Sequence, residues 1–95
     1  MEDNRDERRK DEELINDKIM LYEKILKAAR KKKENLTSYM EEIADIMRKL
    51  KTDEVKEELA IITQENYKKM LDLDISLAIA EKELETYRLI RGMFN

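Results

Sequence analysis

The feature that most constrains this chain is a row of mostly apolar residues that recur at alternating steps of three and four. The row is unbroken through the first half of the chain. Its members are Ile15, Ile19, Tyr22, Leu26, Ala29, Lys33, Leu36, Met40, Ile43, Met47 and Leu50. This spacing places them all on one stripe of an α-helix, at the a and d positions of a heptad repeat. The row therefore predicts a long helix packed against another helix, and an all-α fold.

The phase of this row is lost after Leu50. Continuing the same spacing lands mainly on polar residues, whereas a new row begins at Val55. The members of the second row are Val55, Leu59, Ile62, Asn66, Met70, Leu73, Leu77, Ala80, Leu84 and Tyr87. Two consecutive steps of four around Asn66 form a stutter, which locally unwinds a supercoil. The change of phase predicts a second helix and a turn between the two.

The predicted turn lies at about residues 51–53, with helices over about residues 12–51 and 53–91 on either side. Thr52 is a suitable N-cap for the second helix, because its side-chain oxygen can accept a hydrogen bond from a free backbone N–H. Gly92 is the expected stop at the far end of that helix.

The N-terminal residues 1–11 differ in composition from the rest of the chain. They contain many charged residues and no apolar residue after Met1. Because such a segment has little apolar surface to bury, it cannot offset the entropy lost on ordering. We predict a disordered, charged lead-in over residues 1–11, followed by one helical hairpin over residues 12–95.

The distribution of charge favours an antiparallel hairpin over a parallel arrangement. An antiparallel fold at the predicted turn sets the basic segment 27–33 opposite residues 71–77, which carry Asp72 and Asp74. Opposite charges then meet across the helix pair. Lys33 is a polar member of the first row. We expect its aliphatic stem to pack between the two helices, in the seam formed by the two rows, and its ammonium group to extend toward one of these two carboxylates.

Two other architectures stay open from the sequence. One is a continuous helical rod that dimerises in parallel, which the lack of Pro and the single Gly permit but the change of phase opposes. The other is a strand over residues 71–79, where apolar residues alternate with other residues. The Leu, Ala, Lys and Glu around this segment favour a helix.

Both predicted helices carry more apolar residues than one seam needs. The candidate interface residues are Ile25, Tyr39, Ile46, Leu71, Ile75 and Ile79, with Tyr87 and Phe94 near the C-terminus. One hairpin cannot bury all of them, whereas two hairpins packed as a four-helix bundle can. We therefore expect a homodimer. A helix of another protein is the alternative occupant of the same face.

Composition argues against catalysis. The chain has no His, Cys, Trp or Pro and one Gly, so it lacks most of the residues from which active sites are built. Acidic residues at helical spacing, such as Glu81 and Glu85, resemble helix-borne metal ligands. Carboxylate-bridged metal bundles, however, add a Glu-x-x-His pair, which a chain without His cannot supply. We predict a protein that is not an enzyme and binds neither a metal nor a cofactor.

A basic run offers a further reading of the function. Its members are Lys27, Arg30, Lys31, Lys32 and Lys33. Such a run can contact nucleic-acid phosphates, but the chain has a net charge of −3 and no aromatic residue interleaves the run. A nucleic-acid-binding regulator is therefore the less favoured alternative.

The sequence also bears on the compartment. It has no apolar run that approaches the length of a membrane span, and its first residues are charged where a secretory signal would be apolar. A chain without cysteine suits a reducing compartment. The expectation is a cytoplasmic protein without a membrane partner.

The layout resembles the small all-helical chaperones of type III secretion and flagellar export. The resemblance rests on a charged lead-in, a first helix from Glu12, a turn at residues 49–53, and a second helix with Asn66 ahead of Met70. It implies a cytoplasmic chaperone that holds an aggregation-prone export substrate through helix-to-helix contacts. It transfers no binding residue to this chain. A structural coiled-coil subunit of a larger assembly, viral or cellular, is the alternative.

Overall fold

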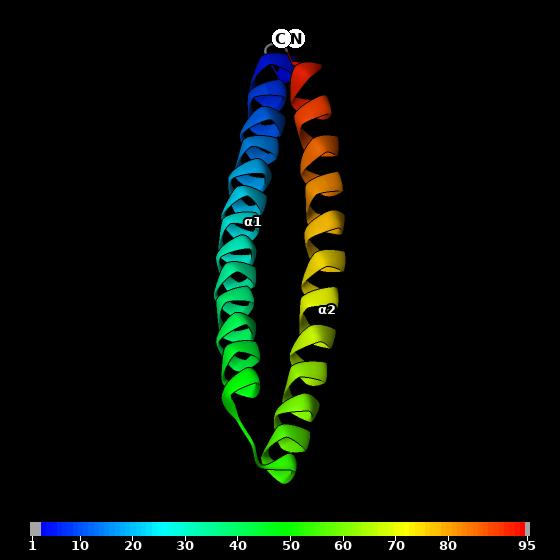
Figure 1. Ribbon diagram of the computed structural model, residues 1–95. Coiled ribbons are helices and arrows are strands. Elements are labelled where there is room, and N and C mark those ends of the chain that lie inside the picture. The colour runs from blue at the N-terminus through cyan, green and yellow to red at the C-terminus, as the bar shows by residue number, and fades with distance from the viewer. Residues whose placement is uncertain (1–2, 95) are drawn as a thin grey trace. The chain divides into compact units, whose positions relative to one another are not determined.

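The computed structural model describes residues 3–94, which form two helices joined by a short turn (Figure 1). Helix α1 spans Asp3–Lys49 and has 47 residues. Helix α2 spans Asp53–Gly92 and has 40 residues. The all-α fold and the helical hairpin predicted from the two rows are confirmed, and within the described residues the segment 71–79 is helical rather than a strand.

The hairpin divides into two compact units. Unit 1 consists of residues 3–28 and 77–94, and unit 2 consists of residues 29–76, which include the turn. Each unit contains one segment of α1 and one segment of α2. The helices are antiparallel in each of them, since lower-numbered residues of α1 contact higher-numbered residues of α2.

Unit 1 holds most of the buried apolar side chains. Its buried residues are Ile19, Leu26, Leu77, Ala80 and Leu84, each at most 9% exposed. All five belong to the two predicted rows. The ring of Tyr22 stacks on that of Tyr87 with a centroid distance of 5.6 Å, and the guanidinium of Arg8 lies 5.6 Å from the ring centroid of Phe94. The seam therefore pairs α1 with α2 in the register that an antiparallel hairpin requires.

Unit 2 is less deeply buried than unit 1. Ile43 is its one buried apolar residue among those described, and Asn66 is buried beside the seam's half-buried members. The half-buried members are Ala29, Lys33, Leu36, Met40, Met47, Leu50, Leu59, Ile62, Met70 and Leu73. Lys33 forms an ion pair with Asp74, one of the two carboxylates that the sequence predicts as its partner. Near the turn, the Thr63 hydroxyl lies 3.9 Å from the Met47 sulfur.

The start of the first helix differs from the prediction. The helix begins at Asp3 rather than at about residue 12, so the lead-in predicted as disordered is helical over residues 3–11; residues 1 and 2 lie outside the described residues. The prediction weighed only apolar burial. It left out the helix-forming Arg, Glu and Lys of this segment, and opposite charges at i and i+4 such as Asp6 and Lys10, which stabilise a helix. The contact of Arg8 with Phe94 adds a long-range interaction.

The turn consists of Leu50, Lys51 and Thr52, close to the predicted position. The backbone N–H of Leu50 donates to the carbonyl of Ile46, and Thr52 directly precedes α2 with its carbonyl accepting from the N–H of Lys56, both at 3.1 Å. Acidic residues begin α2 and basic residues end α1, which complements the helix dipoles.

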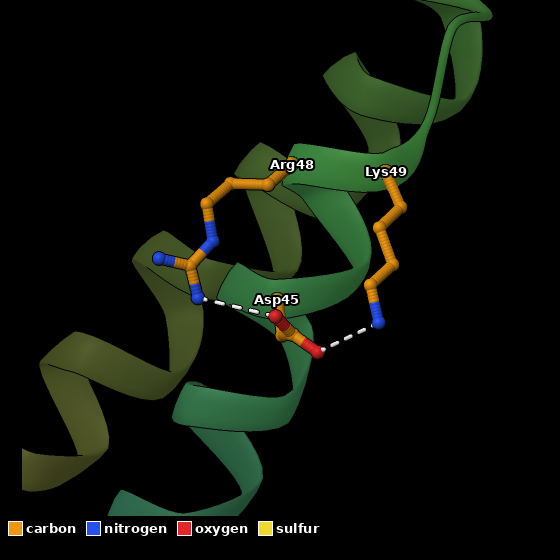
Figure 2. A network of polar contacts seen from close by, with 3 residues as sticks. All are labelled: Asp45, Arg48 and Lys49. Atoms are coloured by element: carbon orange, nitrogen blue, oxygen red, sulfur yellow. Dashed lines mark hydrogen bonds and ion pairs between the residues drawn. The ribbon is translucent and has the colours of Figure 1, made fainter.

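A local charge network closes α1 just before the turn. The carboxylate of Asp45 binds Arg48 at 3.3 Å and Lys49 at 3.2 Å, one on each oxygen (Figure 2). At the other end of the hairpin, α2 ends at Gly92, one residue beyond the predicted end at about residue 91. Two backbone hydrogen bonds follow the helix there. The N–H of Met93 donates to the carbonyl of Ile90, and the N–H of Phe94 donates to the carbonyl of Arg91. No described residue adopts a positive φ, so this end forms without a left-handed cap.

Asn66 is the exception to apolar packing in unit 2. Its side chain is 6% exposed, and its amide nitrogen has no hydrogen-bond partner among the described residues. The stutter places it between Ile62 and Met70 on the side that faces α1, where all three are buried or half-buried. Leaving a buried donor unpaired costs about 1–3 kcal/mol. We therefore expect Asn66 to lower the stability of this seam.

We expect truncation of the seam in unit 1 to destabilise the hairpin strongly. Leu84 is 4% exposed and Leu89 is 68% exposed on the same helix. Leu84→Ala should lower the free energy of unfolding by about 2–5 kcal/mol, because it leaves a cavity in packed surroundings. The matched control Leu89→Ala should change it by less than about 0.5 kcal/mol. Urea denaturation followed by circular dichroism measures both, and equal losses would contradict the observed packing.

Replacing Asn66 should have the opposite effect on stability. Asn66→Leu keeps the branched shape and removes the unpaired donor, so the free energy of unfolding should rise by about 1–3 kcal/mol. Gln64→Leu, at an exposed position on the same helix, is the control and should change stability little. Urea denaturation measures the free energy of unfolding of both variants. A loss of stability in Asn66→Leu would show that the amide of Asn66 has a hydrogen-bond partner in solution.

Candidate protein-binding surface

Six of the eight predicted interface residues lie at the surface. Their exposed fractions are 44% for Ile25 and 55% for Ile79 in unit 1, and 47% for Tyr39, 50% for Ile46, 49% for Leu71 and 59% for Ile75 in unit 2. The other two are half-buried in unit 1, where Tyr87 contacts Tyr22 and Phe94 contacts Arg8. These last two therefore already contribute to the packing of their own hairpin.

Helix α2 carries apolar side chains on opposite faces within unit 2. Leu73 belongs to the seam and is half-buried against α1, whereas Leu71 and Ile75 are exposed. In an α-helix these residues cannot share one narrow stripe, because successive residues are rotated by about 100°. A helix that is apolar on several sides is typical of one with neighbours on several sides. Leu71 and Ile75 form the outer pair, as we call it below.

A groove in unit 2 lies beside the seam and has a volume of about 540 Å³. Its lining residues are Lys32, Asn35, Leu36 and Tyr39 of α1, and Lys69, Asp72, Leu73 and Ser76 of α2. Each helix supplies residues at i, i+3, i+4 and i+7, which is the spacing of one helix face over two turns. The groove therefore runs along the two helices instead of crossing them.

The floor and the rim of this groove differ in chemistry. Leu36 and Leu73 are half-buried members of the two rows and form an apolar floor, while the other lining residues are exposed. Because the helices are antiparallel, Lys32 lies at one end of the groove and Lys69 at the other, on opposite helices. The predicted interface residue Tyr39 lies at the same end as Lys69.

The sequence analysis missed most of this groove. It identified Tyr39, and it assigned Lys32 to a basic run without placing it beside a partner helix. Three groove residues of α2 are each adjacent in sequence to a member of the second row: Lys69, Asp72 and Ser76. This adjacency to the row is the sequence signal that marks a groove wall. Finding the groove from sequence also requires the rotation of each helix about its axis, which the rows alone leave undetermined.

The predicted basic run is divided by its contacts. Within unit 2, Lys33 is half-buried and paired with Asp74, while Lys31 and Lys32 are exposed. Only Lys32 of these three lines the groove. The run is therefore not one uniform basic face in unit 2.

A second polar cluster lies in unit 1. The phenol of Tyr22 is hydrogen-bonded to the carboxylate of Glu83, and this bond, with partial burial and the negative charge of Glu83, raises the pKa of Tyr22 above its usual value. Nearby, Arg88 binds Glu23 at 3.2 Å across the helices. These contacts join α1 to α2 around the Tyr22 and Tyr87 stack.

The described residues hold no group of three or more acidic, His or Cys side chains placed to bind a metal ion. Neither helix, over its described length, has a stretch apolar and long enough to cross a bilayer. No family model, no curated protein and no solved structure matches this chain.

The Tyr22 contact has a measurable consequence for pH dependence. Its raised pKa favours the neutral phenol in the folded state, so the stabilisation is complete below the ordinary tyrosine pKa of about 10 and is lost as pH rises through the raised value. Glu83→Gln should lower the pKa of Tyr22, because it removes the neighbouring charge. Carbon-13 NMR of ring-labelled tyrosine follows this titration.

Glu85→Gln is the matched control for that experiment. It removes the same charge from an exposed residue on the same helix, and the pKa of Tyr22 should not change. An unchanged pKa of Tyr22 in Glu83→Gln would contradict the effect of the Glu83 charge on this phenol.

Proposed function

We propose that this chain is a non-enzymatic, cytoplasmic protein-interaction module whose exposed apolar residues pack against α-helices of other chains, a second copy of itself among them. The observation that carries this proposal is the exposure of large apolar side chains on both helices, which the hairpin itself does not bury. Contiguous exposed apolar surface marks interaction sites on proteins. On helices such surface is usually covered by a further helix.

The outer pair on α2 supports a homodimer. With the seam on one side and Leu71 and Ile75 on another, α2 has the apolar distribution of a helix inside a bundle rather than at its edge. Two hairpins that pack through this face form a four-helix bundle, which is a common way for hairpins to gain a core. A small chain has a large surface for its volume, so the additional burial is a substantial gain.

The chaperone function implied by the resemblance agrees with this proposal. A chaperone of that kind holds a helical, aggregation-prone segment of an export substrate. Such a role needs apolar helix surface that can be covered and uncovered, and the exposed residues of both helices supply it. A permanent structural subunit would use the same surface without exchange, so the exchange rate separates the two functions.

Removing the outer pair should abolish self-association and leave the hairpin folded. We expect the unmodified chain to be a dimer and Leu71→Ser/Ile75→Ser to be a monomer, because both side chains are exposed in the single hairpin. Gln64→Ser/Lys68→Ser is the matched control, with the same spacing on exposed positions of α2, and it should stay dimeric. Sedimentation equilibrium measures the mass, and circular dichroism checks the fold.

Subunit exchange then tests whether the association is reversible. The chain has no native cysteine, so Ser38→Cys gives one exposed labelling site. Donor- and acceptor-labelled samples should develop energy transfer within minutes of mixing if the chain is an interaction module. A dimer that never exchanges would favour the structural subunit, and a chain that is monomeric at all concentrations would overturn the homodimer.

A further inference from the structure

We infer that the groove of unit 2 binds an acidic amphipathic helix of a partner protein, an inference that rests on the proposed function and names the class of partner. The groove is lined by two antiparallel helix segments, each over two turns. A third helix laid along such a groove contacts both walls at once, and this is the usual way in which a helical peptide is recognised. The apolar residues of that helix would contact Leu36, Leu73 and Tyr39.

The charges on the rim select the flanks of the partner helix. Lys32 and Lys69 stand on opposite walls and at opposite ends of the groove. Among the described residues neither has an ion pair or a side-chain hydrogen bond, whereas the neighbouring Lys33 is already paired with Asp74. Two lysines without partners beside an apolar floor favour a helix that carries carboxylates on both sides of its apolar stripe.

The spacing of the two lysines adds a geometric requirement. Residues 32–39 rise by about 10 Å along α1, at 1.5 Å per residue. A partner helix therefore needs one carboxylate near each end of a segment of about two turns, with the two on opposite flanks. Its apolar residues at i, i+3 or i+4, and i+7 would fall between them, over the floor of the groove.

The rim and the floor argue against two other occupants of this groove. A second copy that docked groove to groove would bring together two rims that each carry two lysines and one aspartate and are therefore both net positive, and like charges at an interface are unfavourable. The homodimer is therefore assigned to the outer pair and not to the groove. Asp72 on the rim disfavours any anionic partner alike, but a nucleic acid has no stripe of aliphatic side chains to cover Leu36 and Leu73 on the floor, which an amphipathic helix has. The acidic helix is the occupant that the rim and the floor together favour.

The test uses three synthetic probes and the full chain. The first probe is an 18-residue amphipathic peptide with a leucine stripe flanked by glutamates, the second replaces the glutamates with glutamine, and the third is a single-stranded oligothymidylate. Fluorescence anisotropy measures the affinity of each. We expect the glutamate peptide to bind at least about tenfold tighter than its glutamine twin at low salt, and the difference to shrink as salt is added.

Two pairs of substitutions locate the binding. Lys32→Gln/Lys69→Gln should remove the tenfold preference for the glutamate peptide. Lys31→Gln/Lys68→Gln removes the same charge from exposed neighbours that do not line the groove, and it should preserve the preference. Tyr39→Ser should weaken both peptides by a similar factor, since it removes apolar contact and no charge.

The outcomes separate this inference from the proposed function. Equal affinity for the glutamate and glutamine peptides, or equal effects of the two pairs of lysine substitutions, overturns the inference. Peptide binding of either kind would still support the proposed function. Oligothymidylate binding that is lost in Lys32→Gln/Lys69→Gln overturns it in favour of a nucleic-acid site. If no peptide binds and the Leu71→Ser/Ile75→Ser variant has the same mass as the unmodified chain, both fail together.

Discussion

The antiparallel packing of α1 on α2 along the two rows is the interaction on which every other feature of this protein depends. Long helices rich in charged residues gain most of their stability from an apolar stripe buried against a partner, not from helix propensity. The chain has no cysteine for a disulfide. The turn, the cross-helix ion pairs and the groove all exist because the stripes bring the two helices together.

The seam buries more apolar side chains in unit 1 than in unit 2, and this difference bears on the proposed function. Unit 1 contains five buried apolar side chains and the stack of Tyr22 on Tyr87, whereas unit 2 contains Ile43 and the unpaired Asn66. Segments with few buried apolar contacts are the ones that open or rearrange most easily. The candidate groove lies in unit 2. The less buried unit thus carries the surface with most room to adapt to a partner, while the more buried unit maintains the pairing of the helices.

The parts of the fold that the sequence predicted follow from periodicity. The spacing of three and four identifies the buried apolar residues of α1, the loss of phase after Leu50 locates the turn, and opposite charges predict that Lys33 pairs with Asp72 or Asp74, of which Asp74 is the partner. The start of α1 could not be predicted in this way. It involves local charge spacing and a contact between Arg8 and Phe94, which are far apart in the sequence. The groove depends on how each helix is rotated, which a row of seam residues does not specify.

Asn66 connects stability with the specificity of the pairing. A seam built only from aliphatic residues at heptad spacing is nearly as well packed after a slip of one heptad, because each apolar residue finds another opposite it. A buried polar residue and a fixed ion pair give the native and the slipped registers different free energies. A slip of one heptad would separate Lys33 from Asp74, and it would place the amide of Asn66 opposite different residues of α1. The slipped registers therefore lose an ion pair that the native register has.

The outer pair and the groove lie on different sides of α2, and this separation bears on the two proposed kinds of association. Leu71 precedes Asp72, and Ile75 precedes Ser76, so the two surfaces are separated by a rotation of about 100° on the same two turns. An α-helix with its side chains is about 10–12 Å across. Two helices that each pack about 10 Å from the axis of α2 and are separated by this rotation lie about 15 Å apart, beyond the interaxial distance of about 8–10 Å of packed helices. A second hairpin on the outer pair, as proposed above, would therefore leave the groove open to a partner helix.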